Sequence, residues 1–157
     1  MDALKLLTER YSEKKLSAPA PDKHQLTQMF QAALRSPDHG RLQPYRFIVI
    51  EQDKMTELSR LLKSAVHELN LGEERLKKAE NLATRAPMII GVVAKIDPNI
   101  KKVPEWEQLL CAGCATYAIQ LAANALGFKN VWVSGPWLDG SDLRQAFQCD
   151  TADKIIG

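Results

Sequence analysis

The sequence predicts an α+β protein in which helices cover a central mixed sheet. Two apolar runs of strand length carry this prediction. Tyr45 to Glu51 is rich in β-branched residues, and Pro87 to Ile96 is a continuous apolar run. Helical patterns of apolar residues stand before, between and after them. Because a strand that is apolar throughout is usually covered on both faces, we expect the second run to be central.

The first helix is expected to begin after Asp2, a common capping residue, and to end near Arg10. Its Leu4 and Leu7 are expected to face inward. The Ala-Pro-Ala-Pro stretch at 18–21 predicts an extended connector, because each proline disfavours helix in the residue before it.

A second helix is expected after Asp22 and should stop before Pro37. Its apolar stripe consists of Leu26, Met29, Phe30, Ala33 and Leu34. After the first strand, a third helix should break at Gly72; its apolar positions are Leu58, Leu61, Leu62, Ala65, Val66 and Leu69. A charged and more exposed helix is expected from Glu73 to Arg85.

After the central strand, Lys101 to Pro104 is expected to be a loop. The stretch from about Glu105 to Leu126 is apolar nearly all round, which predicts a buried helix with Gly127 as its stop. A short strand over Lys129 to Ser134 and a Gly135-Pro136 turn should follow. A last helix is expected over Ser141 to Phe147, and Lys154 to Gly157 resembles the start of a strand.

The bulk composition limits the function classes. The chain has 157 residues, 45% hydrophobic and 25% charged, which is typical of one globular domain. A net charge of +2 gives no reason to expect nucleic acid or an anionic membrane as a partner. No apolar run approaches the roughly 20 residues of a membrane span, and the N-terminus lacks a signal pattern. Three cysteines fit a reducing cytoplasm.

Two polar clusters at expected element ends suit a phosphorylated cofactor. They are Arg10-Tyr11-Ser12-Glu13-Lys14 and the stretch from Arg35 to Pro44, which reads RSPDHGRLQP. Arginine offers forked donors to phosphate oxygens, lysine a point charge and serine a neutral donor. Either cluster alone would favour the alternative of a solvated helix end, whose basic side chains interact with the C-terminal carbonyl groups of that helix. Together, in this order, they favour a cofactor site.

The ordered set of motifs resembles the FMN-dependent nitroreductase family. That family opens with a helix, an R-x-S-x-R/K motif, a second helix and a P-S-x-x-N-x-Q-P-W-like loop before a strand. The corresponding stretches here are RYSEK and PDHGRLQPYRFIVI. The opening MDAL, the PDH loop, WEQ, AGCA and a W-x-S-G turn are most similar to the compact YdjA-type subgroup of NAD(P)H nitroreductases. The resemblance covers essentially all 157 residues, as one domain over 1–157.

This resemblance implies a homodimer with FMN in the subunit interface, in which the two clusters serve one flavin from different subunits. Hydride would pass from NADH or NADPH to FMN and on to a nitroaromatic, quinone or similar acceptor, with no side chain as a compulsory nucleophile. Family members usually continue beyond Lys154–Gly157 into a tail that packs on the partner, so the C-terminal strand and tail are expected to be missing here. The alternative is a flavin-binding or interaction protein on the same scaffold with little turnover.

By the same resemblance, Arg10 and Ser12, with Tyr11 between them, would bind the FMN phosphate or ribityl chain. Lys14 matches the last basic position of the family motif, and Lys15 occupies the place that the subgroup uses.

In the second cluster, Arg35 and His39 match the subgroup's loop, although each has an alternative as a surface helix-end or capping residue. Gln43 would hydrogen-bond the pyrimidine edge of the flavin or act as a turn residue. Arg41 stands where the wider family has Asn.

Further along, Trp132, Val133 and Ser134 match the turn that approaches the flavin. Val133 replaces an Arg that is frequent in the subgroup, and core packing is the alternative for Trp132. The subgroup's nicotinamide nucleotide stretch corresponds to Ala122, Ala123, Asn124, Ala125, Leu126 and Gly127. These residues read as a buried helix end, and the chain has no G-x-G-x-x-G fingerprint.

Cys111 and Cys114 have the spacing of a metal or redox pair, but they fall within an apolar helix. A closed zinc site normally has four ligands, so buried small residues are the favoured interpretation and no metal is expected.

Overall fold

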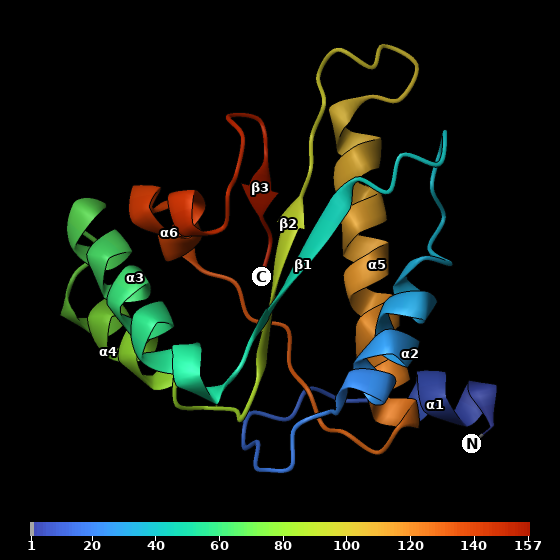
Figure 1. Ribbon diagram of the computed structural model, residues 1–157, viewed down its shortest axis with the longest axis horizontal. Coiled ribbons are helices and arrows are strands. Elements are labelled where there is room, and N and C mark those ends of the chain that lie inside the picture. The colour runs from blue at the N-terminus through green and yellow to red at the C-terminus, as the bar shows by residue number, and fades with distance from the viewer. Residues whose placement is uncertain (1) are drawn as a thin grey trace.

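A computed structural model describes residues 2–157 and shows an α+β fold around a three-stranded sheet (Figure 1). The strands are β1 (Tyr45–Ile50), β2 (Ile89–Ala94) and β3 (Lys154–Ile155), in the order β1-β2-β3. Tyr45 pairs with Ala94 and Val93 with Ile155, and both pairings are antiparallel. The central place of β2 confirms the prediction. The mixed pairing that we expected is not seen within residues 2–157.

Six α-helices of the described chain surround the sheet. They are α1 (Ala3–Glu9), α2 (Lys23–Ala33), α3 (Met55–Glu68), α4 (Glu73–Leu82), α5 (Glu105–Ala125) and α6 (Ser141–Ala146), with 3-10 turns η1 (Gln52–Lys54) and η2 (Pro136–Asp139). Asp2 caps α1 by accepting the Lys5 N–H, and Asp22 forms a reciprocal capping box with Gln25 on α2. Gly127, with φ +90°, follows α5. The predicted helices are therefore confirmed.

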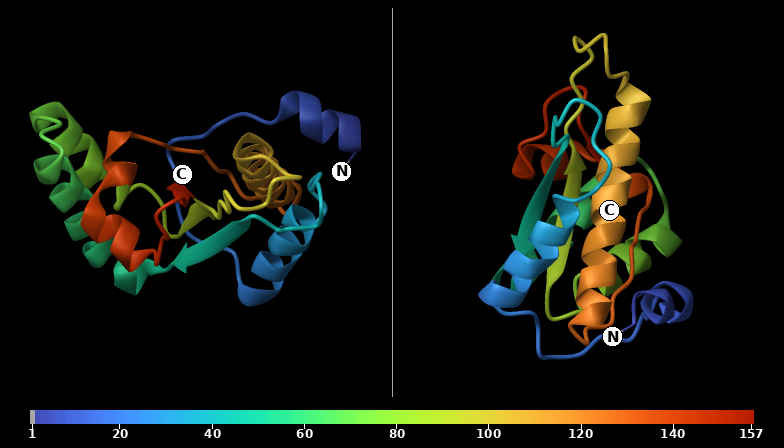
Figure 2. Two further views of the ribbon diagram at one scale, coloured as in Figure 1. Left: turned by 90° about the horizontal axis from the view of Figure 1, so that it is seen from above. Right: turned by 90° about the vertical axis from the view of Figure 1, so that its right-hand side faces the viewer.

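The sheet is covered on both faces (Figure 2). On one face α3, α4 and α6 form a core with side chains such as Leu62, Val93 and Trp137. On the other face α2 and α5 form a core that includes Met29 and Ile119. Neighbouring strand residues point to opposite faces, so the apolar run of β2 supplies both cores at once.

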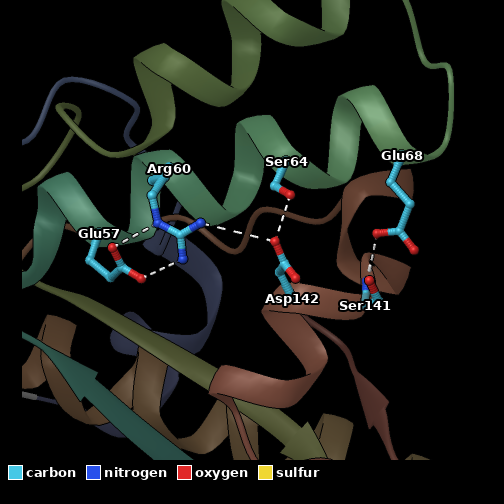
Figure 3. A network of polar contacts seen from close by, with 6 residues as sticks. All are labelled: Glu57, Arg60, Ser64, Glu68, Ser141 and Asp142. Atoms are coloured by element: carbon cyan, nitrogen blue, oxygen red, sulfur yellow. Dashed lines mark hydrogen bonds and ion pairs between the residues drawn. The ribbon is translucent and has the colours of Figure 1, made fainter.

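A polar network fastens α6 to α3 (Figure 3). The Ser64 hydroxyl donates to Asp142 Oδ2 at 2.7 Å, and Arg60 lies 4.0 Å from the same carboxylate while pairing with Glu57 at 2.7 Å. The hydrogen bond from Arg60 lowers the pKa of Glu57. One turn further, the backbone N–H of Ser141 donates to Glu68, so both anchors lie at the start of α6.

The start of α5 is held by a buried amide. Gln108 is 1% exposed, accepts the Asp97 N–H at 2.8 Å, and donates to the carbonyl oxygens of Asp97 and Val103, each at 2.9 Å. Since all three contacts lie on the loop between β2 and α5, Gln108 fixes the first turn of α5 against that loop.

Two predictions about burial are wrong. Leu4 and Leu7 of α1 are 71% and 48% exposed, and Leu34 at the end of α2 is 51% exposed. The helix α5 is buried on one side only. Its exposed row of large apolar side chains consists of Trp106, Leu109, Leu110 and Tyr117. An apolar pattern predicts that a side chain is buried. At these positions, however, no other element of residues 2–157 covers the side chain.

The predicted strand over Lys129 to Ser134 is also wrong, because this segment is extended but belongs to no sheet. Its contacts are isolated: the Glu13 N–H donates to the Asn130 carbonyl at 3.0 Å, and Trp132 Nε1 donates to the Ile156 carbonyl at 2.9 Å. A strand requires a ladder of backbone bonds to a neighbour, and none pairs with this segment in the described chain. Across residues 2–157, the helices also fall short of the length and apolarity needed to cross a membrane.

Candidate functional site

Arg10 and Ser12 form a donor cluster just after α1. The Arg10 backbone N–H closes the helix on Leu6, and a terminal guanidinium nitrogen donates to the Ser12 hydroxyl at 3.3 Å. The inner nitrogen Nε of Arg10 is buried and has no hydrogen-bond partner within residues 2–157. Buried donors are normally paired, so this nitrogen is available to an acceptor such as a phosphate oxygen.

The segment after α5 completes this cluster. Lys129 Nζ lies 4.6 Å from the centre of the Tyr11 ring, and Glu13 donates its backbone N–H to Asn130. Asn130 is held in turn by two hydrogen bonds with Gln120 of α5, at 2.9 and 3.0 Å. Two segments that are distant in sequence are thereby joined at the C-terminal end of α5.

Several predicted cofactor residues lie in or beside this joined region. The exposed residues among them are Lys14, Lys15 and Ser134. Trp132 is 41% exposed, and Val133 is partly buried. The indole N–H of Trp132 is used by the Ile156 carbonyl, so this side chain both packs and forms a surface. The packing interpretation of Trp132 is therefore supported, and its place beside the flavin stays a prediction.

A cavity of about 620 Å³ adjoins the cluster, between β2 and the segment 128–133. Lys15, Trp132 and Val133 are among its lining residues. Trp137 lines the cavity too, and its indole nitrogen is buried without a partner within residues 2–157. The cavity is of the size that holds a drug-sized ligand, with a few polar groups among apolar walls.

The nucleotide stretch 122–127 is the end of α5 and the turn after it. Ala123 is 3% exposed and packs in the core, while Leu126 and Gly127 line the cavity. The Asn124 side chain donates to the Phe128 carbonyl at 3.0 Å and closes the turn. As the residues suggested, these positions build a helix end.

The second predicted cluster lies at the opposite end of α5. His39 Nδ1 is 2.6 Å from Glu107 Oε2, in the first turn of that helix. The Asp38 carboxylate accepts the backbone N–H groups of Leu42 and Gln43, at 3.0 and 2.7 Å, and shapes the loop.

Arg35, Arg41 and Gln43 are exposed around this loop. Arg41 and Gln43 have positive φ values of 54° and 46°, which is uncommon outside glycine. Such backbone conformations mark a loop whose shape is set by local hydrogen bonds.

One chain therefore does not bring the two clusters together. The Arg10 cluster contacts residues after the end of α5, whereas His39 contacts its first turn (Figures 1 and 2). A helix of 21 residues is about 30 Å long at 1.5 Å per residue. Within one chain the two clusters therefore lie at opposite ends of a long helix and not around one site.

The cysteine spacing carries no redox pair in this structure. Cys111 is 5% exposed, whereas Cys114, almost one turn further along α5, is exposed, and both thiols are free. Burial raises the pKa of Cys111 to about 11, with smaller contributions from Asp38 and Cys114. A thiol with such a pKa is largely un-ionised at neutral pH and is a poor nucleophile.

Three contributors to the site were not predicted: Lys129, Asn130 and Glu107. Each acts through a contact with a segment far away in the chain. Lys129 and Asn130 stand in no motif. Glu107 belongs to the WEQ stretch, but that stretch does not indicate that Glu107 contacts His39, so only the folded structure reveals these contacts.

The comparisons with known proteins agree in one family. The profile of the nitroreductase family matches residues 7–157. The chain is 64% identical over 156 residues to a "Putative NAD(P)H nitroreductase" of Haemophilus influenzae, covering 99% of this chain and 85% of that protein. It is 43% identical over 157 residues to "Putative NAD(P)H nitroreductase YdjA" of Escherichia coli K12, covering 100% of this chain and 85% of that protein.

Solved structures show the same fold. A nitroreductase-like protein from Bacillus cereus superposes with a TM-score of 0.84 at 19% identity, over 100% of this chain and 82% of that one. A nitroreductase in complex with FMN from Desulfovibrio desulfuricans superposes with a TM-score of 0.69 at 22% identity, over 98% of this chain and 80% of that one.

Proposed function

This chain belongs to the nitroreductase family, and from that premise we propose that it is a homodimeric oxidoreductase that passes hydride from NAD(P)H through FMN to a nitroaromatic, quinone or similar electron-poor acceptor. The nicotinamide leaves before the acceptor enters the same place, which is a ping-pong sequence. Because the cysteines are unpaired, we expect the protein to work in the cytoplasm.

The Arg10 cluster is the observation that carries this proposal. Its buried, unpartnered guanidinium nitrogen and the adjacent Ser12 hydroxyl offer donors of the kind that bind phosphate. Arg10 and Ser12 hold the phosphate end of FMN, and Tyr11 is kept in place beneath Lys129. Without an anion, the buried nitrogen of Arg10 would remain a costly unsatisfied donor.

The remaining residues shape the surroundings of the flavin ring. FMN itself supplies the hydride acceptance and electron transfer when it is bound. Lys14 or Lys15 provides positive charge where reduction builds negative charge, and Trp132 with Ser134 forms one wall. None of these groups acts as a nucleophile, so the protein contributes binding, orientation and electrostatics.

The exposed apolar surface supports the homodimer. Leu4 and Leu7 of α1 and the exposed row of α5 would remain in contact with water in a single chain. Exposed large apolar side chains in such number are typical of subunit interfaces when they gather on one surface. A two-fold pairing along α5 can place the His39 loop of one subunit beside the Arg10 cluster of the other, which one chain cannot do.

A flavin-binding protein with little turnover is the second candidate. Val133 favours it, because an apolar side chain lines the cavity where the subgroup often carries a cation. Such a protein would bind FMN but would not oxidise NAD(P)H at a useful rate.

The deciding experiment combines a flavin spectrum with a turnover assay. Protein reconstituted with FMN and freed of excess flavin should retain one FMN per chain and oxidise NADH or NADPH when menadione or a nitroaromatic is added. Retained flavin without oxidation would select the second candidate. Failure to retain flavin under any reconstitution condition would refute both.

A further inference from the structure

The contact between His39 and Glu107 joins two parts of the molecule that are 68 residues apart in sequence. The oxygen Oε2 of Glu107 lies 2.6 Å from Nδ1 of the imidazole, which is a short distance for a hydrogen bond between these groups. The Glu107 side chain is 28% exposed and the His39 side chain 47% exposed. The pair therefore lies at the surface with the ring only partly covered.

Both partners stand on fixed backbone. The His39 loop is closed by the Asp38 carboxylate, and Gly40 in it has a φ of +82°, at a place where a Cβ atom would lie 3.4 Å from the Val103 side chain. Glu107 donates its backbone N–H to the Pro104 carbonyl at 3.0 Å, and the next residue, Gln108, anchors the start of α5. A hydrogen bond between two segments that are each held by local hydrogen bonds restricts the orientation of the ring more strongly than one between unsupported side chains.

The contact also decides which ring nitrogen carries the proton. An ionised carboxylate has no hydrogen to donate, so the hydrogen of this bond belongs to Nδ1 of His39. In the neutral ring, Nε2 is then left with its lone pair and acts as an acceptor. A ligand that offers an N–H or O–H group meets a ring that is already in the required tautomer.

We propose that Glu107 is a positioning residue of the flavin site: it holds His39 with Nδ1 protonated, so that Nε2 accepts an N–H or O–H hydrogen from FMN bound at the subunit interface. This inference rests on the proposed function. It assigns to Glu107, in the WEQ stretch at the start of α5, the role of orienting a loop histidine for the cofactor.

The tautomer can be measured without any cofactor. Long-range ¹H–¹⁵N correlation spectra of the neutral imidazole should show the hydrogen on Nδ1. In Glu107→Ala the spectrum should change to a mixture of tautomers or to the Nε2–H form. A wild-type ring with its hydrogen on Nε2 would overturn the proposal, whatever the protein does with flavin.

The second measurement is FMN affinity in a double-mutant cycle. Glu107→Ala and His39→Ala should each raise the FMN dissociation constant about 3- to 10-fold, as expected for the loss of one hydrogen bond. The double variant should bind no more weakly than His39→Ala alone, because Glu107 acts through that ring. Glu107→Asp should recover part of the loss. Glu105→Ala is the matched control, since it removes an exposed carboxylate from the same helix turn and should leave affinity unchanged.

The outcomes separate the inference from the proposed function. If the wild type binds FMN but Glu107→Ala behaves like Glu105→Ala, or if the two losses add in the double variant, the positioning role is refuted and the flavoprotein assignment stands. If the wild type retains no FMN, the proposed function fails and this role fails with it, even where the tautomer is as expected.

Discussion

The hydrogen bonding of Arg10 could not be predicted from the sequence, although the residue itself could. The RYSEK motif identified the residue, but only the structure shows that its Nε is buried without a partner while another guanidinium nitrogen bonds Ser12. His39 was found in the same way, through its motif. The WEQ stretch contains its partner Glu107, but the contact between the two was not predicted, because a contact across 68 residues leaves no periodic or local signal.

Replacing Arg10 by Ala should weaken FMN binding about 10- to 100-fold, because charge-assisted hydrogen bonds to the phosphate contribute about 1.5–3 kcal/mol. Titration of the apoprotein with FMN, followed by quenching of flavin fluorescence, gives the dissociation constant. Arg75→Ala on α4 serves as the control, since it removes a partly buried arginine from the other side of the sheet. An unchanged affinity in Arg10→Ala would contradict the assignment.

Cys111 predicts a pH effect on stability. Burial raises its folded-state pKa from 9.0 to about 11, so the folded chain keeps the proton to higher pH than the unfolded chain does. The free energy of unfolding should therefore fall as the pH rises from 9 to 11. Urea unfolding at several pH values should show a shallower fall in Cys111→Ala than in Cys114→Ala. Equal slopes in both variants would argue against this role of burial.

Elements whose local signals agree with their environment were predicted well. The capped helices α1 and α2, the break at Gly72 and the strands β1 and β2 all lie where capping residues and apolar patterns place them. The segment 129–134 was not predicted correctly, because strand propensity cannot supply a neighbouring strand. The burial of α1 and α5 was overestimated for the related reason that a pattern does not say what covers it.

The attachment of α6 to α3 should be measurable. Asp142→Ala removes the acceptor of the Ser64 hydroxyl and the distant partner of Arg60. We expect the free energy of unfolding to fall by about 1 kcal/mol, the net value of one partly exposed hydrogen bond. Thermal and urea unfolding of this variant can be compared with Glu80→Ala, which removes an exposed carboxylate from α4. A loss no larger than that of Glu80→Ala would show that the network in Figure 3 contributes little.

At the scale of the whole molecule, the exposed row of α5 predicts an association of two chains. Leu110 is 60% exposed in the middle of that row, so Leu110→Glu would place a charge in the proposed interface. Light scattering should give twice the 17.6 kDa chain mass for the wild type and a single chain mass for Leu110→Glu, together with loss of retained flavin.

Leu69→Glu provides the comparison for that variant. Leu69 is 37% exposed at the end of α3, away from α5, and its replacement should leave the assembly unchanged. A wild type that is monomeric at all concentrations while retaining FMN would remove the basis for an interface site.

The placement of the two clusters at opposite ends of α5 has a genetic consequence. If each flavin pocket draws Arg10 from one polypeptide and His39 from the other, defects at these two positions should complement each other. Co-expressed subunits, one carrying Arg10→Ala and the other His39→Ala, would form hybrids in which one pocket contains both changes and the other contains neither. A preparation that mixes the two variant subunits should then contain pockets with wild-type FMN affinity, which neither parent variant has alone.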